Sequence, residues 1–124
     1  MGYPEGAMTS KKLPVLPSER ELDACVNQLK VLADATRLAV IRLLLAGPMH
    51  VTQLSEQLAV EQSLLSHHLK VLRDAGLVEA NRQGKQMLYR VADGVEKSFS
   101  SAESIDLGCC QLSFAALSAT PRKR

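Results

Sequence analysis

Residues 62–74 read QSLLSHHLKVLRD, and the spacing of their apolar and polar side chains decides the fold. Leu65, Leu69 and Leu72 recur at the three- and four-residue intervals of a helix with one buried stripe. Short polar side chains, followed by cations, lie on the opposite side. We therefore predict a helix from Gln62 to about Ala75 that packs one side on a core and presents the other to a partner.

Three further helices are predicted upstream. Ser18 and Glu21 have the spacing of a capping box at the start of the first. Asp34 caps the second helix and Thr52 the third, because both residue types favour that position. Gly47 ends the second helix in the left-handed conformation. The periodic apolar side chains are Leu22, Cys25, Val26, Leu29 and Leu32 in the first helix, Leu38, Ile41, Leu44 and Leu45 in the second, and Leu54 and Leu58 in the third.

Downstream, the apolar period changes from about 3.6 to about 2. Residues 77–82 and 86–91 are extended runs around Gln83-Gly84-Lys85, which predicts a hairpin. A weaker helix is predicted from Val95 to about Ala102. Two helices joined by a tight turn and followed by a hairpin are typical of a winged helix-turn-helix. The predicted fold class is therefore α+β, mainly α with a β-hairpin wing.

The composition favours a single cytoplasmic domain. The chain has 124 residues, 46% hydrophobic and only 3% aromatic, so aliphatic side chains must build the core. No apolar run approaches the roughly 18 residues of a membrane span, no signal peptide is visible, and we expect no membrane partner. The odd number of cysteines, three, argues against a secreted disulfide framework. A net charge of +2 leans weakly toward polyanionic partners.

The polar side of residues 62–74 predicts contact with the DNA major groove. A recognition helix touches base edges with residues near its start, where an amide and hydroxyls suit base hydrogen bonding. Cations later in the helix and in the hairpin suit phosphates, with Arg90 as a further candidate. The predicted DNA-binding residues are Gln62, Ser63, Ser66, His67, Lys70, Arg73, Arg82 and Lys85. An ordinary solvated amphipathic helix is the alternative.

Adjacent histidines at positions 67 and 68 also suggest a zinc site. Neighbouring side chains on a helix point about 100° apart and make poor joint ligands. We therefore expect His67 to face outward and His68 to pack inward.

Three stretches, LADATRLAVIRLLLAG, VTQLSEQLAVEQSLLSHHLKVLRDAGLV and GKQMLYRV, resemble the ArsR/SmtB family of dimeric bacterial repressors. The resemblance covers roughly residues 22–95. It implies a homodimer formed by the first and last helices, bound to an imperfect palindromic operator in double-stranded DNA. It also implies release from DNA by an inducer, usually a metal ion, metalloid or oxidant. No arrangement of catalytic residues is visible, so we expect no enzyme; a winged helix used only for protein contacts is a minor alternative.

The known sensor sites of the family are not reproduced. Arsenic, cadmium and lead sensors carry Cys-Val-Cys at the start of the third helix, where this chain has His50-Val51-Thr52. Zinc sensors use Asp, His and Glu on the last helix. The corresponding positions here are Asp93, Val95, Asp106 and Cys109, which include no histidine.

Cys109 and Cys110 remain as the candidate sensor, and three chemistries fit them. The first is capture of arsenite, antimonite or another soft ion, because soft thiolates select soft ions, with Cys25 as a candidate third ligand. The second is a reversible Cys109–Cys110 disulfide that senses peroxide. It would be strained, because neighbouring Cα atoms lie closer than disulfides prefer. The third is two buried small apolar side chains. Cys25 alone is better explained as packing, and no resident cofactor is expected.

These readings divide the chain into three parts. Residues 1–17 are predicted to be a disordered arm. Residues 18–103 form the DNA-binding and dimerisation domain. Residues 104–124 carry the paired cysteines and end in a basic tail, PRKR.

Overall fold

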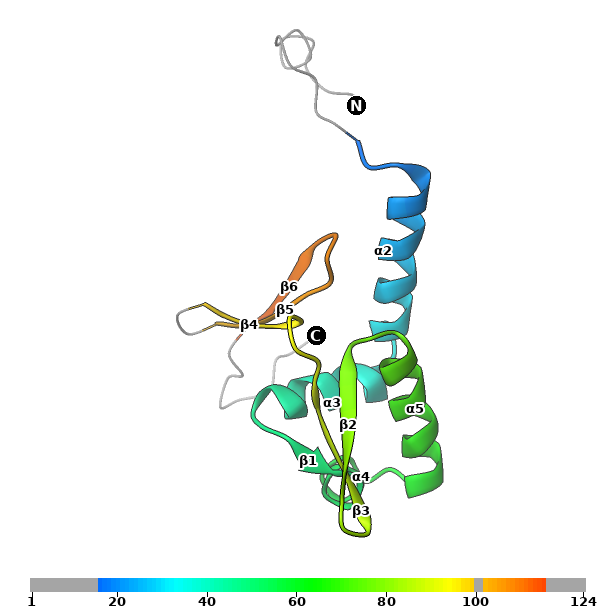
Figure 1. The fold of residues 1–124 in the computed structure, drawn as a ribbon, viewed down its shortest axis with the longest axis vertical. Coiled ribbons are helices and arrows are strands. Elements are labelled where there is room, and N and C mark those ends of the chain that lie inside the picture. The colour runs from blue at the N-terminus through cyan, green and yellow to red at the C-terminus, as the bar shows by residue number, and fades with distance from the viewer. Residues whose placement is uncertain (1–15, 100–101, 116–124) are drawn as a thin grey trace, which may run out of the picture.

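The computed structural model describes residues 16–99 and 102–115, and most of the predicted N-terminal arm and the basic tail lie outside this range (Figure 1). Helices and strands follow each other along the chain as four helices and six short strands within the described part. They are α2 (Glu19–Leu32), α3 (Ala35–Leu45), β1 (Met49–His50), α4 (Val51–Leu58), α5 (Gln62–Asp74), β2 (Val78–Gln83), β3 (Gln86–Val91), β4 (Glu96–Phe99), β5 (Ala102–Asp106) and β6 (Gln111–Phe114).

The predicted helix starts are confirmed for α2 and α3. The Glu21 backbone N–H donates to Ser18 Oγ at 3.2 Å, and the Ser18 N–H donates back to Glu21 Oε1 at 2.8 Å. The Arg37 N–H donates to Asp34 Oδ2 at 3.0 Å at the start of α3. These side chains satisfy backbone donors that a helix leaves unpaired in its first turn.

The third helix starts earlier than predicted. α4 begins at Val51, with His50 rather than Thr52 at the cap position. The Gln53 side chain accepts the His50 N–H at 2.8 Å, which is the contact from the third helical residue back to the cap residue and differs from the one expected from a threonine hydroxyl. Gly47 has a φ of 150°, outside the left-handed helical range predicted for it. Ala59 instead takes the left-handed conformation, with a φ of 53°, at the end of α4.

The apolar stripe of α5 lies at the centre of the core, as predicted. Leu65, Leu69 and Leu72 are fully buried. They pack with buried side chains of α3, α4 and the strands; this core consists of Leu32, Val40, Ile41, Leu44, Leu54, Leu77, Val78, Val91, Ile105 and Leu107. Burying a leucine removes roughly 1.5–3 kcal/mol of unfavourable hydration, so the three leucines hold α5 at one rotation about its axis.

The predicted wing is confirmed. β2 and β3 pair antiparallel from Val78↔Val91 to Gln83↔Gln86, with Gly84 in the turn at a φ of 61°. The sequence did not indicate β1, which adds to β3 on the other side and gives the order β1-β3-β2. Together α4, α5 and the β2–β3 hairpin form a winged helix-turn-helix.

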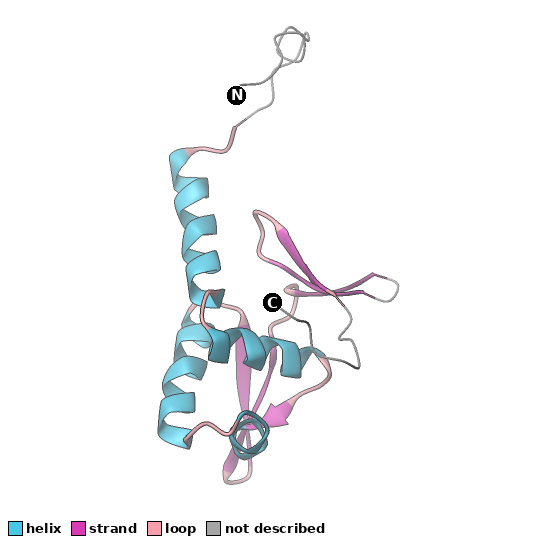
Figure 2. Cartoon of the chain, turned by 180° about the vertical axis from the view of Figure 1, so that it is seen from behind, coloured by secondary structure: helices cyan, strands magenta, loops and turns pink. Residues whose placement is uncertain are grey.

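The predicted last helix, from Val95 to about Ala102, is wrong. This part of the chain forms β4 and β5, which pair antiparallel with each other, and β6 then pairs with β5 (Figure 2). Serines weaken a helix because their hydroxyls compete for backbone hydrogen bonds. The residues of β6 alternate between exposed and half-buried, a period of two that indicates a strand. Ile105, which is fully buried, ties this sheet to the core.

The new sheet changes two earlier expectations. The last helix that was expected to form part of the dimer interface is not found among residues 16–99 and 102–115, because strands occupy its place. The predicted boundary after residue 103 falls inside β5. Arg42 of α3 lies 4.7 Å from the Phe114 ring centroid and donates to the Ala115 carbonyl at 3.4 Å, so the sheet is also attached at its far end.

The helix α2 projects away from the rest of the molecule (Figure 1). Its last leucine, Leu32, is buried in the core. Leu22, Val26 and Leu29 are 48%, 43% and 42% exposed, although they lie on one side of the helix at apolar spacing. The first helix therefore forms as predicted, but most of its apolar side has no partner within the described chain. None of the described helices is both long and apolar enough to cross a bilayer.

Replacing Asp34 with alanine is expected to lower the free energy of unfolding by about 1 kcal/mol at neutral pH, the usual effect of losing an N-cap. The bond from the Arg37 N–H lowers the pKa of Asp34. Its stabilisation is therefore complete above the ordinary carboxyl pKa of about 4 and is lost as pH falls through the lowered value. Urea unfolding of both proteins across this pH range measures it. An Asp34→Asn control, which keeps a capping oxygen, should retain most of the stability at neutral pH; a loss equal to that of alanine would contradict the capping role.

Candidate nucleic-acid interface and thiol cluster

One side of α5 presents the predicted DNA-reading residues to solvent. Gln62, Ser63, Ser66, His67, Lys70 and Arg73 are all exposed. The buried leucines of the same helix determine this orientation, because they point the opposite side outward. Arg82 and Lys85 are exposed near the tip of the β2–β3 hairpin. The eight residues thus lie on two adjoining elements, a helix and the wing that follows it.

Some of these side chains already have local partners. Lys70 Nζ lies 2.9 Å from Asp74 Oδ2, and both side chains are more than 60% exposed. The hydrogen bond from Lys70 lowers the pKa of Asp74. Ser63 Oγ donates to Glu61 Oε1 at 3.1 Å. Exposed pairs of this kind contribute little free energy, so a phosphate can replace the carboxylate as the partner of Lys70.

The two histidines of α5 face different ways, as predicted. His67 is exposed. The His68 side chain is 13% exposed, and its Nδ1 lies 3.0 Å from Arg37 Nη1. Since a guanidinium only donates, His68 Nδ1 is the acceptor in this contact. Arg37 Nε also donates to the Val31 carbonyl at 2.6 Å, a bridge between α2, α3 and α5 that sequence reasoning did not find.

Arg90 is unsuited to the phosphate role considered for it. Its guanidinium bonds to Glu79 at 2.7 Å and to Asp93 at 3.3 Å. Two carboxylates therefore already neutralise this cation. The neighbouring wing cation Arg82 donates only weakly, to the Gly84 carbonyl at 3.4 Å, and stays exposed.

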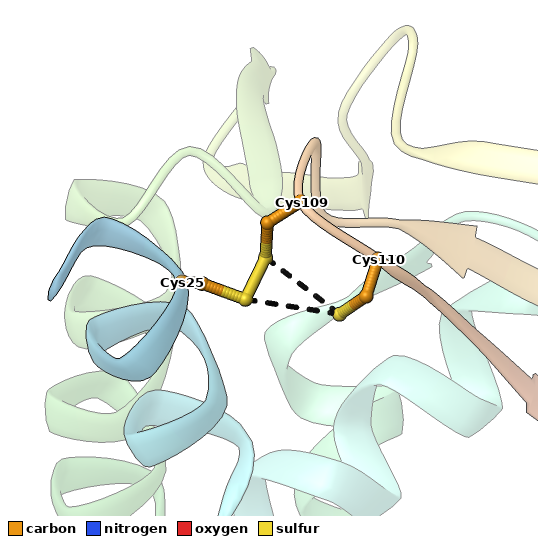
Figure 3. Close-up of side chains that lie close together, drawn as sticks. All are labelled: Cys25, Cys109 and Cys110. Atoms are coloured by element: carbon orange, nitrogen blue, oxygen red, sulfur yellow. Dashed lines mark hydrogen bonds between the residues drawn. A yellow bond between two sulfur atoms is a disulfide. The ribbon is translucent and has the colours of Figure 1, made fainter. Parts of the chain in front are cut away.

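The three cysteines form a second candidate site, on the side of α2 that faces the β5–β6 turn (Figure 3). Cys25 is half-buried on α2, and its sulfur forms a disulfide with Cys109. Cys110 keeps a free thiol. Its Sγ lies 3.7 Å from that of Cys109 and 4.0 Å from that of Cys25. Residues 84 positions apart in the sequence therefore meet within one chain.

Three expectations about the cysteines are wrong. The disulfide joins Cys109 to Cys25, not to Cys110. The Cα atoms of the actual pair lie 5.7 Å apart, within the usual range for disulfides, whereas sequence neighbours are closer than that range. Cys25 is not simply a packing residue. The proposal of buried apolar thiols also fails, because Cys109 and Cys110 are exposed.

The backbone of the β5–β6 turn presents both of its thiols to α2. Gly108 has a φ of 90°, a conformation that side chains disfavour, and its N–H donates to Asp106 Oδ1 at 2.8 Å. The Leu107 N–H donates to the Cys110 carbonyl at 2.9 Å and closes the turn. Two consecutive cysteines at such a turn can both approach a sulfur on a neighbouring helix.

The cluster suits a soft ion when its thiols are reduced. The three sulfurs lie within 4.8 Å of one another, and they are the one group of three or more potential metal ligands found among the described residues. Thiolates select soft, thiophilic ions. While the disulfide is intact only Cys110 offers a thiolate, so reduction must come before three-sulfur coordination.

A cavity of about 690 Å³ lies beside the cluster. One wall is the side of α2 that carries Cys25 and Gln28, and the opposite wall includes Ala75, Leu107 and Cys109. The cavity therefore separates part of α2 from the end of α5.

Comparison with known proteins places the chain among bacterial regulators. Residues 34–80 match the family described as bacterial regulatory protein, arsR family. The chain is 36% identical over 101 residues to the HTH-type transcriptional regulator NmtR of Mycobacterium tuberculosis, covering 77% of this chain and 84% of NmtR.

Two further proteins show the same similarity. The transcriptional repressor SmtB of the same species is 40% identical over 80 residues, 64% of this chain and 59% of SmtB, which is under two thirds of that protein. The homodimeric winged helix-turn-helix DNA-binding domain Mb0332 of Mycobacterium bovis superposes with a TM-score of 0.56 at 33% identity, covering 61% of this chain and 73% of the other.

Replacing His67 or Lys70 with alanine is expected to weaken binding to a promoter fragment without unfolding the protein. A lost base contact costs about 1–3 kcal/mol, whereas a lost phosphate contact lowers the salt slope of binding by about one. Fluorescence anisotropy at several salt concentrations measures both effects. Lys30→Ala, an exposed cation on α2, is the matched control. Affinities that equal the wild type in both α5 variants would exclude this side of the helix as the reader, and a flat salt dependence would favour a protein-interaction module.

Air-oxidised protein is expected to show one free thiol per chain and to migrate as a monomer in a non-reducing denaturing gel, because the disulfide lies within one chain. Cys25→Ser should raise the count to two free thiols, since sequence neighbours pair poorly. Thiol titration and peptide mapping measure these outcomes. A mapped bond between residues 109 and 110 in the wild type would contradict the observed pairing.

Proposed function

Since the chain belongs to the ArsR family of bacterial transcriptional regulators, which are not enzymes, we propose that it is a homodimeric repressor released from its operator by a thiophilic ion bound to Cys25, Cys109 and Cys110. Arsenite and antimonite are the favoured inducers. The observation that carries the proposal is the meeting of three sulfurs within 4.8 Å, contributed by α2 and the β5–β6 turn.

The DNA half of the proposal rests on the exposed side of α5 and on the wing. DNA binding and homodimerisation are typical of this family. In a two-fold symmetric dimer, two copies of α5 enter successive major grooves about 34 Å apart. Gln62, Ser63, Ser66 and His67 would contact base edges. The cations Lys70, Arg73, Arg82 and Lys85 would contact phosphates.

The exposed stripe of α2 supports the dimer. Leu22, Val26 and Leu29 are each more than 40% exposed and lie on one side of the helix. Neighbouring apolar side chains on a projecting helix are best satisfied by a second apolar surface. A second copy of α2 offers one with the two-fold symmetry of an isologous interface. With strands in place of the expected last helix, α2 becomes the main helical surface for dimerisation.

The same helix carries the sensor residue Cys25, and this suggests how the signal reaches DNA. A change at the cluster alters how α2 is held against the β5–β6 turn. Because α2 also carries the dimer stripe, the angle between protomers changes with it, and so does the spacing of the two copies of α5. A coupling of about 1–3 kcal/mol is sufficient for a typical allosteric response.

The chemistry of capture balances within one chain. Arsenous acid, As(OH)₃, exchanges its three hydroxyl groups for three cysteine sulfurs and releases three waters. Each cysteine gives up one proton, and no electrons are transferred. One protomer supplies all three sulfurs, so we expect one ion per chain and two per dimer.

The disulfide favours a second candidate, a repressor that senses oxidants. Peroxide takes two electrons and two protons from the thiols of Cys25 and Cys109, which become the disulfide while peroxide becomes two waters. The observation behind this candidate is the Cys25–Cys109 bond itself. It replaces the earlier hypothesis of a bond between residues 109 and 110.

Cys110 separates the two candidates, because three-sulfur capture needs it and the disulfide does not. We expect arsenite to lower the operator affinity of the reduced wild type by about 5- to 150-fold, the usual range for coupled sites. Cys110→Ser should lose this response and keep any response to peroxide, whereas Cys25→Ser should lose both. The measurement is operator release titrated with arsenite, antimonite, cadmium, zinc and hydrogen peroxide, with free thiols counted after each.

Two outcomes would contradict the metalloid-sensor proposal. If Cys25→Ser still releases DNA with arsenite, the three-sulfur site is wrong. If only peroxide releases the wild type, the oxidant-sensing candidate replaces the metalloid sensor.

A further inference from the structure

Gln28 connects the helix that carries the sensor to the helix that reads DNA. It lies three residues after Cys25 on α2, so the two side chains are neighbours on one side of that helix. Gln28 Nε2 donates to the carbonyl oxygen of Ala75 at 3.3 Å. Ala75 is the C-cap residue of α5. The contact therefore joins a residue about one helical turn after Cys25 to the C-terminal end of the recognition helix.

The acceptor is a group whose position matters for α5. The last carbonyls of a helix have no donor within the helix and carry the negative end of its dipole. A side-chain amide from α2 supplies a donor to one of them. Because α5 is held in rotation by its buried leucines, this contact at its end acts on its tilt relative to α2.

The cavity makes α2 movable at this point. Cys25, Gln28 and Ala75 all line its wall. Side chains there do not pack tightly across the gap, so fewer contacts resist a shift of α2 than in the core. The disulfide and the Gln28 bond are two links that span this region. Opening or closing the Cys25–Cys109 disulfide therefore changes the geometry of the hydrogen bond from Gln28 to Ala75.

The other amide atom of Gln28 has no hydrogen-bond partner in this arrangement within the described residues. This atom, Gln28 Oε1, is buried. Buried acceptors without partners are rare because they lose their hydration without replacement. A shift of α2 that brings this oxygen to a donor or to solvent would remove that cost.

We propose that Gln28 is the positioning residue that transmits the state of the thiol cluster to α5. When the disulfide holds Cys25 against the β5–β6 turn, Gln28 holds the end of α5. When the thiols are reduced, Cys25 is released from the turn and the hold on Ala75 changes, whereas an ion bound by all three sulfurs ties Cys25 to the turn again. This inference rests on the proposed function, because it describes how that site regulates DNA binding.

A second connection between α2 and α5 lies further along the chain. Arg37 bonds to the Val31 carbonyl at 2.6 Å and to His68 at 3.0 Å. It joins the core end of α2, where Leu32 is buried. That end is anchored whatever the state of the cysteines. Arg37 therefore stabilises the fold, whereas Gln28 responds to the state of the thiol cluster.

The test compares operator affinity between three states of the full-length protein: reduced, arsenite-bound and oxidised. Gln28→Met removes both amide groups at similar length. Gln28→Lys keeps a donor for the helix end. Asn27→Leu is the matched control, since Asn27 is the neighbouring amide, lines the same cavity and forms no hydrogen bond with α5 within the described part of the chain. Thiol counts and arsenite stoichiometry establish that the cluster is intact in every variant.

We expect Gln28→Met to bind arsenite like the wild type and, in the reduced state, to bind the operator like the wild type. The ratio of operator affinities between the reduced state and the other two states falls about two- to tenfold, the factor of one net hydrogen bond. Gln28→Lys should retain the ratio, and Asn27→Leu should leave it unchanged. An unchanged ratio in Gln28→Met, or an equal loss in Asn27→Leu, would overturn the role of Gln28 and leave the proposed function standing. A wild type with equal affinity in all three states would overturn both.

Discussion

Leu65, Leu69 and Leu72 leave almost no surface to water, and their burial determines how α5 is rotated about its axis. The other features of the proposed DNA-reading side of α5 follow from that rotation. The polar residues between the leucines must point outward, and His68 must turn toward Arg37 while His67 meets solvent. The wing is then placed beside α5, because β2 begins directly after the turn that ends the helix. A core of aliphatic side chains thus positions a polar surface it does not touch.

The helix α2 carries several features that move together because they lie on one rigid element. Its C-terminal end is anchored in the core by Leu32, and its length carries an exposed apolar stripe, the disulfide-bonded Cys25 and the amide of Gln28. A helix that is anchored only at one end can shift at its other end, and so change the geometry of a proposed dimer, with little rearrangement of the core. In the proposed mechanism, the chemistry at the three sulfurs therefore need not reach the DNA-reading side chains themselves.

Most of the winged helix-turn-helix could be predicted, whereas the C-terminal third could not. Strong apolar periodicity, the caps at Ser18 and Asp34 and the turn at Gly84 are local signals, and the structure confirms them. The segment after Val95 has weak helix signals and short alternating runs, so local propensity does not decide between a helix and strands. Pairing between β4, β5 and β6 decided it, because strands become favourable only when neighbours satisfy their backbone groups.

The sequence by itself determined the four helices up to Asp74, the wing and the family, and it singled out Cys109 and Cys110 as candidates, since each depends on residues close together in the chain. Only the tertiary structure decided that Cys25 is the partner of Cys109, because contact across 84 residues leaves no periodic or spacing signal. The same holds for the bond from Gln28 to Ala75 and for the bridge through Arg37. The helix 62–74 was therefore recognisable from its own residues, but what holds its end, and what can move it, is defined by elements that only the folded chain brings beside it.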